Sequence, residues 1–283
     1  MRSVTVQPAD RPAGAPDGIF YGWIVTGAAF VILTVAYGVQ FSFGVFVEDI
    51  EKSTGWSKTS LSAAYSVYIF GYSFLSRFSG ALTDRFGPRR VVALGAFFMA
   101  GGYILTGQAR SFWLFALGLS LLAAIGMSAS WVPCSATVSR WFERKRGVAL
   151  GIATSGGSMG GFIVPLVAGV LATRYDWRVA YTVLGASAGV VLFVCSRIIV
   201  RDPALKGLEP DGVRSEPGTT PAPAWGFTRS EAIRTPFFWV AGAIFLFTWL
   251  VVFMPIVHLV PYGEEHGFSK EAATLIISAI GLG

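Results

Sequence analysis

The chain has 283 residues, of which 53% are hydrophobic and only 13% are charged, and its formal net charge is +6. Soluble domains average about 25% charged residues, so this chain has too few charged side chains to cover a water-soluble fold. The same composition, with only two cysteines, excludes a disordered chain and a disulfide-stabilised scaffold. We therefore expect an all-α polytopic membrane protein.

Seven stretches without any aspartate, glutamate, lysine or arginine follow one another along the chain. They are residues 20–47, 59–76, 91–109, 111–139, 147–173, 179–196 and 237–263. Each is long enough to cross about 30 Å of hydrocarbon as a helix, and none alternates as a transmembrane strand would. An eighth apolar stretch begins near Lys270 and reaches Gly283 before it could cross. We therefore expect the chain to end inside a helix.

The cations fall mainly on one side of these spans. With a cytoplasmic N-terminus, all but six of the 22 lysines and arginines lie in the cytoplasm; the six are Lys52, Lys58, Arg110, Arg174, Arg178 and Lys270. The positive-inside rule then predicts a multi-pass cell-membrane protein with its N-terminus in the cytoplasm. The excess of lysine and arginine in the cytoplasmic loops accounts for the pI of about 9.5. No nucleic-acid-binding surface is therefore expected.

The spacing of the spans divides the chain into four parts. Residues 1–18 are expected to be a cytoplasmic tail, and residues 19–200 a six-helix transmembrane bundle. Residues 201–235 carry five prolines among polar residues and are expected to be a cytoplasmic linker, too poor in apolar residues to fold by itself. Residues 236–283 would begin a second bundle. Two bundles joined by an inner linker are typical of a transporter, whereas a seven-span receptor would place the N-terminus outside.

The loop between the second and third spans carries a motif. Its sequence, GALTDRFGPRR at residues 80–90, closely resembles the signature G-x-L-x-D-R-x-G-R-[RK] of the major facilitator superfamily. The matching residues are Gly80, Asp84, Arg85, Gly87, Arg89 and Arg90. Gly80 would let two helices approach and Gly87 would allow a tight turn. Asp84 is expected to pair with Arg85, Arg89 or Arg90, or to cap a helix N-terminus, in a cluster that opens during transport.

Three further stretches resemble the monocarboxylate porter family, including its oxalate/formate antiporter-like branch. They are YGWIV at residues 21–25, WFERKRGVALGIA at 141–153 and DWR at 176–178. This resemblance implies a monomeric protein of about twelve spans, of which spans 8–12 would be absent here. It implies rocker-switch transport of small organic carboxylates, with protons or by exchange, and no cofactor or metal. A transporter of another solute class, such as a sugar or a drug, is the alternative.

Candidate substrate contacts must be aromatic or neutral, because none of the seven stretches contains a charged residue. The candidates are Tyr37, Gln40 and Phe41 on one face of the first span, with Trp131, Gly157, Trp249 and Phe253. For each aromatic residue, packing or contact with lipid is the alternative. Tyr65, Tyr68 and Tyr72 are expected to serve packing. Many animal relatives carry a lysine in the first span, where this chain has Phe41.

Two pairs of glycines lie four residues apart in the fifth span. Gly156 with Gly160, and Gly157 with Gly161, would clear a stripe for a neighbouring helix. That stripe would serve static packing or a contact between bundles that slips during transport. Cys134 and Cys195 are expected to be free thiols. No nucleophile, metal cluster or pair of acids at membrane depth supports an enzyme.

Overall fold

The computed structural model describes residues 19–212 and 229–269. In the last helix, only some of the side chains are described. The helices are α1 (Tyr21–Phe41), α2 (Phe43–Thr54), α3 (Lys58–Phe86), α4 (Pro88–Gly107), α5 (Phe112–Ala116), the π-helical η1 (Leu117–Ala123), α6 (Ala124–Ser128), α7 (Trp131–Trp141), α8 (Arg146–Arg174), α9 (Trp177–Ile198), α10 (Arg229–Arg234) and α11 (Pro236–Glu265). Two short 3-10 turns, η2 (Pro203–Lys206) and η3 (Pro210–Gly212), follow α9. The described part of the chain is all-helical, as predicted.

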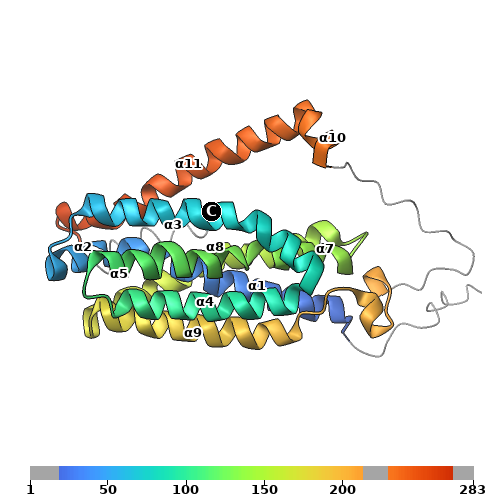
Figure 1. Ribbon diagram of the computed structural model, residues 1–283, viewed down its shortest axis with the longest axis horizontal. Coiled ribbons are helices and arrows are strands. Elements are labelled where there is room, and N and C mark those ends of the chain that lie inside the picture. Colours follow the sequence, from blue (N-terminus) through green and yellow to red (C-terminus); the bar gives the residue numbers. More distant parts are fainter. Residues whose placement is uncertain (1–18, 213–228, 270–283) are drawn as a thin grey trace, which may run out of the picture.

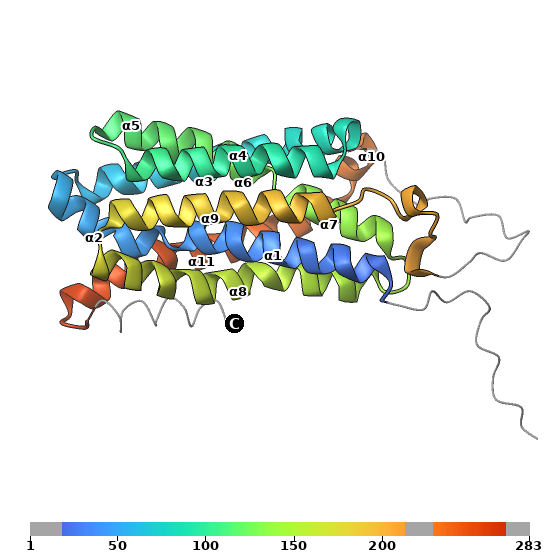
Figure 2. The ribbon, with the colours of Figure 1, turned by 90° about the horizontal axis from the view of Figure 1, so that it is seen from below.

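The long helices α1, α3, α4, α8 and α9 lie side by side along one axis, whereas α11 is inclined to them (Figure 1). Seen from below, α9 lies between α4 and α1, and α1 lies between α9 and α8 (Figure 2). Among the described residues, five helical segments are long and apolar enough to cross a membrane: Tyr21–Thr54, Pro88–Gly107, Phe112–Trp141, Arg146–Arg174 and Trp177–Ile198. Helix α3 is as long as α8, at 29 residues. It is not among these five segments, because the polar residues near its end lower its mean hydropathy. The predicted eighth span, from Lys270 onwards, lies outside the described residues.

Two of the membrane-crossing segments are interrupted. Tyr21–Thr54 breaks at Ser42, whose hydroxyl donates to the Gly38 carbonyl oxygen at 2.8 Å. Phe112–Trp141 contains η1 and breaks again before its last helix, α7. Helix α8, by contrast, continues through Pro165 without a break. At an interruption of this kind, backbone N–H and C=O groups beside a buried surface lose their helical hydrogen-bond partners. Such interruptions are frequent at functional sites.

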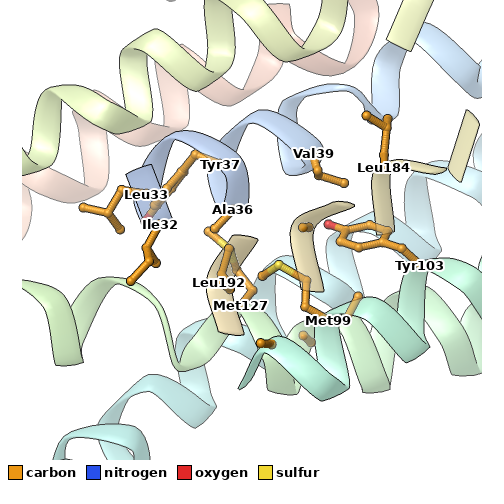
Figure 3. Packing of buried hydrophobic residues seen from close by; sticks show 14 of the residues in the cluster. Ile32, Leu33, Ala36, Tyr37, Val39, Met99, Tyr103, Met127, Leu184 and Leu192 are labelled. Carbon is orange, nitrogen blue, oxygen red and sulfur yellow. The ribbon is translucent and has the colours of Figure 1, made fainter. Parts of the chain in front are cut away.

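The core of the bundle forms where α1 meets α8 and α9, and where α4 meets α9. Figure 3 shows Ala36 of α1, Met99 of α4, Met127 of α6 and Leu192 of α9 gathered in this core, and each is at most 1% exposed. Because these side chains come from helices far apart in sequence, their packing holds α1, α4, α6 and α9 together.

The glycines of α8 explain how closely α1 and α8 approach. A side chain on Gly156 would overlap the Phe30 carbonyl oxygen, and one on Gly160 would overlap the Thr34 carbonyl oxygen. These two glycines therefore serve packing within this bundle, where backbone meets backbone. Gly157 instead faces a tyrosine ring, and Gly161 is buried.

The first residues after α9 pack against the bundle. Residues 199–212, which we call the strap, pack across the bundle end where α1 begins and α7 ends. The side chain of Trp141 donates from Nε1 to the Val200 carbonyl oxygen at 2.8 Å, and the Tyr21 hydroxyl donates to the Ile198 carbonyl oxygen at 2.8 Å. The sequence suggested a linker too polar to fold by itself; here the bundle supplies the apolar surface.

Candidate functional site

A charge cluster joins the ends of two helices, α3 and α7, to the strap. Asp84 lies in the last turn of α3, and its Oδ1 accepts a hydrogen bond from Arg140 Nη2 of α7 at 2.9 Å. Arg140 Nη1 also donates to Oδ1 of Asp202, in the strap, at 3.3 Å. Arg201 Nε lies 3.2 Å from the other oxygen of Asp202. Arg140 is therefore the centre of the cluster, between two carboxylates.

This arrangement corrects the pairing expected for Asp84. The predicted partners Arg85, Arg89 and Arg90 are all exposed, and the guanidinium of Arg85 lies 5.2 Å from the ring centre of Phe86. Arg89 and Arg90 belong to the first turn of α4. Sequence neighbours on a helix point in different directions, so the partner comes from a helix 56 residues away.

The two motif glycines have the roles that their positions suggest. Gly87 adopts φ +83°, a conformation that side chains disfavour, and Pro88 then starts α4 at its first position. A Cβ atom on Gly80 would lie 3.4 Å from the Val132 side chain of α7. The end of α3 is thus held close to α7, the helix that carries Arg140.

The strap also forms hydrogen bonds with backbone groups near the charge cluster. Asp211 Oδ2 accepts hydrogen bonds from the backbone N–H groups of Glu143 and Arg144, at 3.0 and 2.7 Å. Asp211 itself has φ +58°, and Lys206 Nζ lies 3.9 Å above the ring of Tyr21. These contacts bind the strap to the loop between α7 and α8 and to the start of α1.

The charge cluster is suited to opening rather than to permanent stabilisation. The side chain of Asp84 is 67% exposed and that of Arg140 is 36% exposed. Ion pairs in contact with water contribute only about 0.2–1 kcal/mol. A conformational change can therefore break the pair at little cost.

A group of aromatic side chains lies deeper in the bundle. The ring of Tyr37 is 5.8 Å from that of Trp131 and 5.9 Å from that of Phe41, measured between centres. A Cβ atom on Gly157 would lie 3.6 Å from the Tyr37 ring. Tyr37 is buried, whereas Trp131 is 39% exposed. Four of the predicted cavity residues thus form one wall, made by α1, α7 and α8, which we call the aromatic wall.

Gln40 belongs to a different cluster from the one expected. It is 1% exposed; its backbone carbonyl oxygen accepts from the Tyr65 hydroxyl at 3.3 Å and its Oε1 from the Tyr68 hydroxyl at 3.5 Å. Tyr68 also contacts the Tyr103 hydroxyl at 3.4 Å. Gln40 is therefore bound to the tyrosines of α3. Tyr65 and Tyr68, expected to serve packing only, also provide hydrogen bonds to a buried polar group.

The other predicted residues fall in two groups. Trp249 and Phe253 belong to α11, and their side chains lie outside the described ones. Cys134 and Cys195 are free and buried. Arg140, Asp202 and Tyr103 were missed by sequence reasoning. Arg140 stands directly after an apolar span, which is the signal that could have drawn attention to it.

Comparison with known proteins identifies the family. A family model described as the Major Facilitator Superfamily matches residues 28–283. Monocarboxylate transporter 11 of Mus musculus is 29% identical over 273 residues, which cover 96% of this chain and 59% of that protein. Its Homo sapiens counterpart is also 29% identical, over 280 residues covering 96% and 56%. The chain therefore spans less than three-fifths of the length of these relatives.

The fold comparison agrees with this result. A bacterial homologue of the human lysosomal transporter Spinster, in an inward-facing and unoccupied conformation, superposes with a TM-score of 0.74. It is 18% identical and is matched over 95% of this chain and 60% of its own. A helical bundle with these relatives defines a multi-pass membrane protein of the transporter class. The chain belongs to the major facilitator superfamily.

Proposed function

We propose that the protein carries small organic carboxylates across a membrane by rocker-switch alternating access. The observation that supports this most directly is the similarity to monocarboxylate transporters over 96% of the chain. The two sites have separate roles in the proposal. The aromatic wall contacts the substrate, and the charge cluster holds the strap end of the bundle in one of its two arrangements.

The aromatic wall suits the carbon skeleton of such a substrate more than its charge. Tyr37, Phe41 and Trp131 offer ring faces and edges, and no lysine or arginine belongs to this wall. A carboxylate at the middle of a membrane needs a cation or a helix N-terminus. In this proposal the cation comes from the second bundle.

Uptake into liposomes tests the substrate class. The protein expressed from its full gene would be reconstituted and given radiolabelled lactate, formate, oxalate or glucose, with and without an imposed pH gradient. Saturable uptake of a carboxylate but not of glucose is expected. Stimulation by an inward proton gradient would indicate symport, and stimulation by preloaded carboxylate would indicate exchange. Saturable uptake of glucose alone would contradict the proposal.

Truncation of Trp131 is expected to weaken substrate binding. Trp131→Ala removes an exposed ring from the aromatic wall, and an aromatic contact is worth about 0.5–1.5 kcal/mol beyond burial. The KM for carboxylate uptake should therefore rise about three- to tenfold. Trp113→Ala is the matched control, because Trp113 is 80% exposed and lies at another helix end. Equal KM values for the two variants would remove Trp131 from the site.

The orientation is a separate proposal with its own test. We expect the strap end of the bundle to be cytoplasmic. Cysteine at Thr59 and cysteine at Lys145 would report on opposite ends, because both residues are exposed and the native cysteines are buried. On intact cells, an impermeant thiol reagent should label Thr59→Cys but not Lys145→Cys. The reverse pattern would invert the topology.

A further inference from the structure

A hollow lies at the opposite end of the bundle from the charge cluster, between the end of α4 and the start of α9. Its volume is about 660 Å³, and it is lined by Gly107, Gln108, Arg110, Arg178, Val179, Thr182 and Val183. We infer that this hollow binds the phosphate group of an anionic glycerophospholipid in the leaflet at this end. The inference is independent of the transported substrate.

The charge of the hollow matches one phosphodiester. Arg110 and Arg178 both line it, and Nε of Arg178 lies 4.0 Å from Oδ2 of Asp176. Two guanidinium groups and one carboxylate leave a net charge of +1. A phosphodiester carries one negative charge, and guanidinium groups bind phosphate oxygens in a paired geometry.

Arg178 is held in place before any ligand binds. Its Nη1 donates to the Ala109 carbonyl oxygen at 2.6 Å, and its guanidinium lies 4.3 Å from the ring centre of Trp177. Its side chain remains 35% exposed. Arg110, shortly beyond the end of α4, is exposed. One fixed cation and one accessible cation therefore face the same hollow.

The floor of the hollow is formed by close contact between the two helices. A Cβ atom on Gly107 would lie 2.8 Å from Thr182 Oγ1, so only glycine allows α4 and α9 to meet there. Thr182 in turn donates to the Arg178 carbonyl oxygen at 2.9 Å. The hollow is thus a feature of the packed bundle rather than of a loop.

Exposed apolar side chains continue from the hollow along both helices. On α9 these are Val179, Val183 and Val190, and on α4 they are Phe97 and Leu94, each more than 40% exposed. Their helical spacing places them on the outward face of each helix. An acyl chain could lie along this apolar surface with its phosphate group at the arginines.

Aromatic residues place the hollow at the boundary between membrane and water. Trp113, in α5, and Tyr175, between α8 and α9, are 80% and 68% exposed and lie at the same end of the bundle. Exposed tryptophan and tyrosine are enriched at this boundary, which is where lipid phosphates lie. A lipid is therefore the occupant that fits both the charge and the depth.

Lipid titration of the purified, delipidated protein expressed from its full gene tests the inference. Native mass spectrometry would measure the binding of phosphatidylglycerol and of phosphatidylcholine with the same acyl chains. Phosphatidylglycerol should bind about fivefold more tightly, because choline adds a positive charge beside a hollow that is already positive. Equal affinity for the two lipids would overturn the inference.

Substitution then tests the residues. Arg110→Gln should lower the affinity for phosphatidylglycerol about fivefold, to the level of phosphatidylcholine, without changing the melting temperature. Arg174→Gln is the matched control, because Arg174 is exposed at the same end but does not line the hollow. The inference would be overturned if Arg110→Gln left the affinity for phosphatidylglycerol unchanged, or if Arg174→Gln lowered that affinity equally. Arg178 is left intact because it holds the Ala109 carbonyl group.

Discussion

Asp84→Asn is expected to lower carboxylate uptake about fivefold or more, while the protein still inserts into the membrane. The substitution leaves the size of the side chain almost unchanged but removes the charge that Arg140 contacts at 2.9 Å. A pair this exposed is worth about 1 kcal/mol, which changes the ratio of two conformations about fivefold. Transport requires both conformations in turn, so a shift of this kind slows the cycle.

Uptake and membrane insertion would be measured on the same preparation of the full-gene protein. Glu143→Gln is the control, because it removes one negative charge from an exposed side chain at the same end of the bundle. Asp84→Glu should retain much of the activity, since it keeps the charge. Uptake by Asp84→Asn at the level of Glu143→Gln would show that the motif has no role in the transport cycle.

Gly160→Val is expected to destabilise the bundle strongly. Its side chain would overlap the Thr34 carbonyl oxygen of α1, and a backbone cannot move aside as a side chain can. Excess volume at a packed position costs about 1–3 kcal/mol, so the melting temperature in detergent should fall by about 5–10 °C.

Gly151→Val provides the comparison in the same helix. Gly151 is exposed, and a Cβ atom there would meet nothing within 4 Å, so its melting temperature should stay close to that of the parent. Gly160→Ala gives a graded second variant should Gly160→Val prevent folding. Equal melting temperatures for the valine variants at 151 and 160 would contradict the close contact of α1 with α8.

The spans were predictable because the absence of charge marks the part of a helix that lies in hydrocarbon. The predicted stretch 111–139 corresponds to a segment that runs from Phe112 to Trp141, and 147–173 corresponds to Arg146–Arg174. Helix α3 shows the limit of this criterion. It extends to Phe86, well past the predicted 59–76, because polar residues continue the helix after the charge-free stretch ends.

The sequence identified residues of the site more readily than it identified the residues that they contact. The motif identified Asp84, but its contact with Arg140 depends on how α3 and α7 pack. Four of the predicted cavity residues lie close to one another, whereas Gln40 faces the tyrosines of α3. Positions three and four residues after Tyr37 lie about 100° apart on a helix, so Gln40 and Phe41 can face different neighbours. Spacing along one helix does not determine which neighbour stands on each side.

The strap changes where the first bundle should be cut for separate expression. A boundary at residue 200 would leave the bundle without Asp202 and Asp211. The guanidinium of Arg140 would lose one of its two carboxylates, and the N–H groups of Glu143 and Arg144 would lose their acceptor. A piece that ends after Gly212 keeps these contacts. A first bundle that keeps all of these contacts therefore extends past residue 200, the boundary predicted from the sequence.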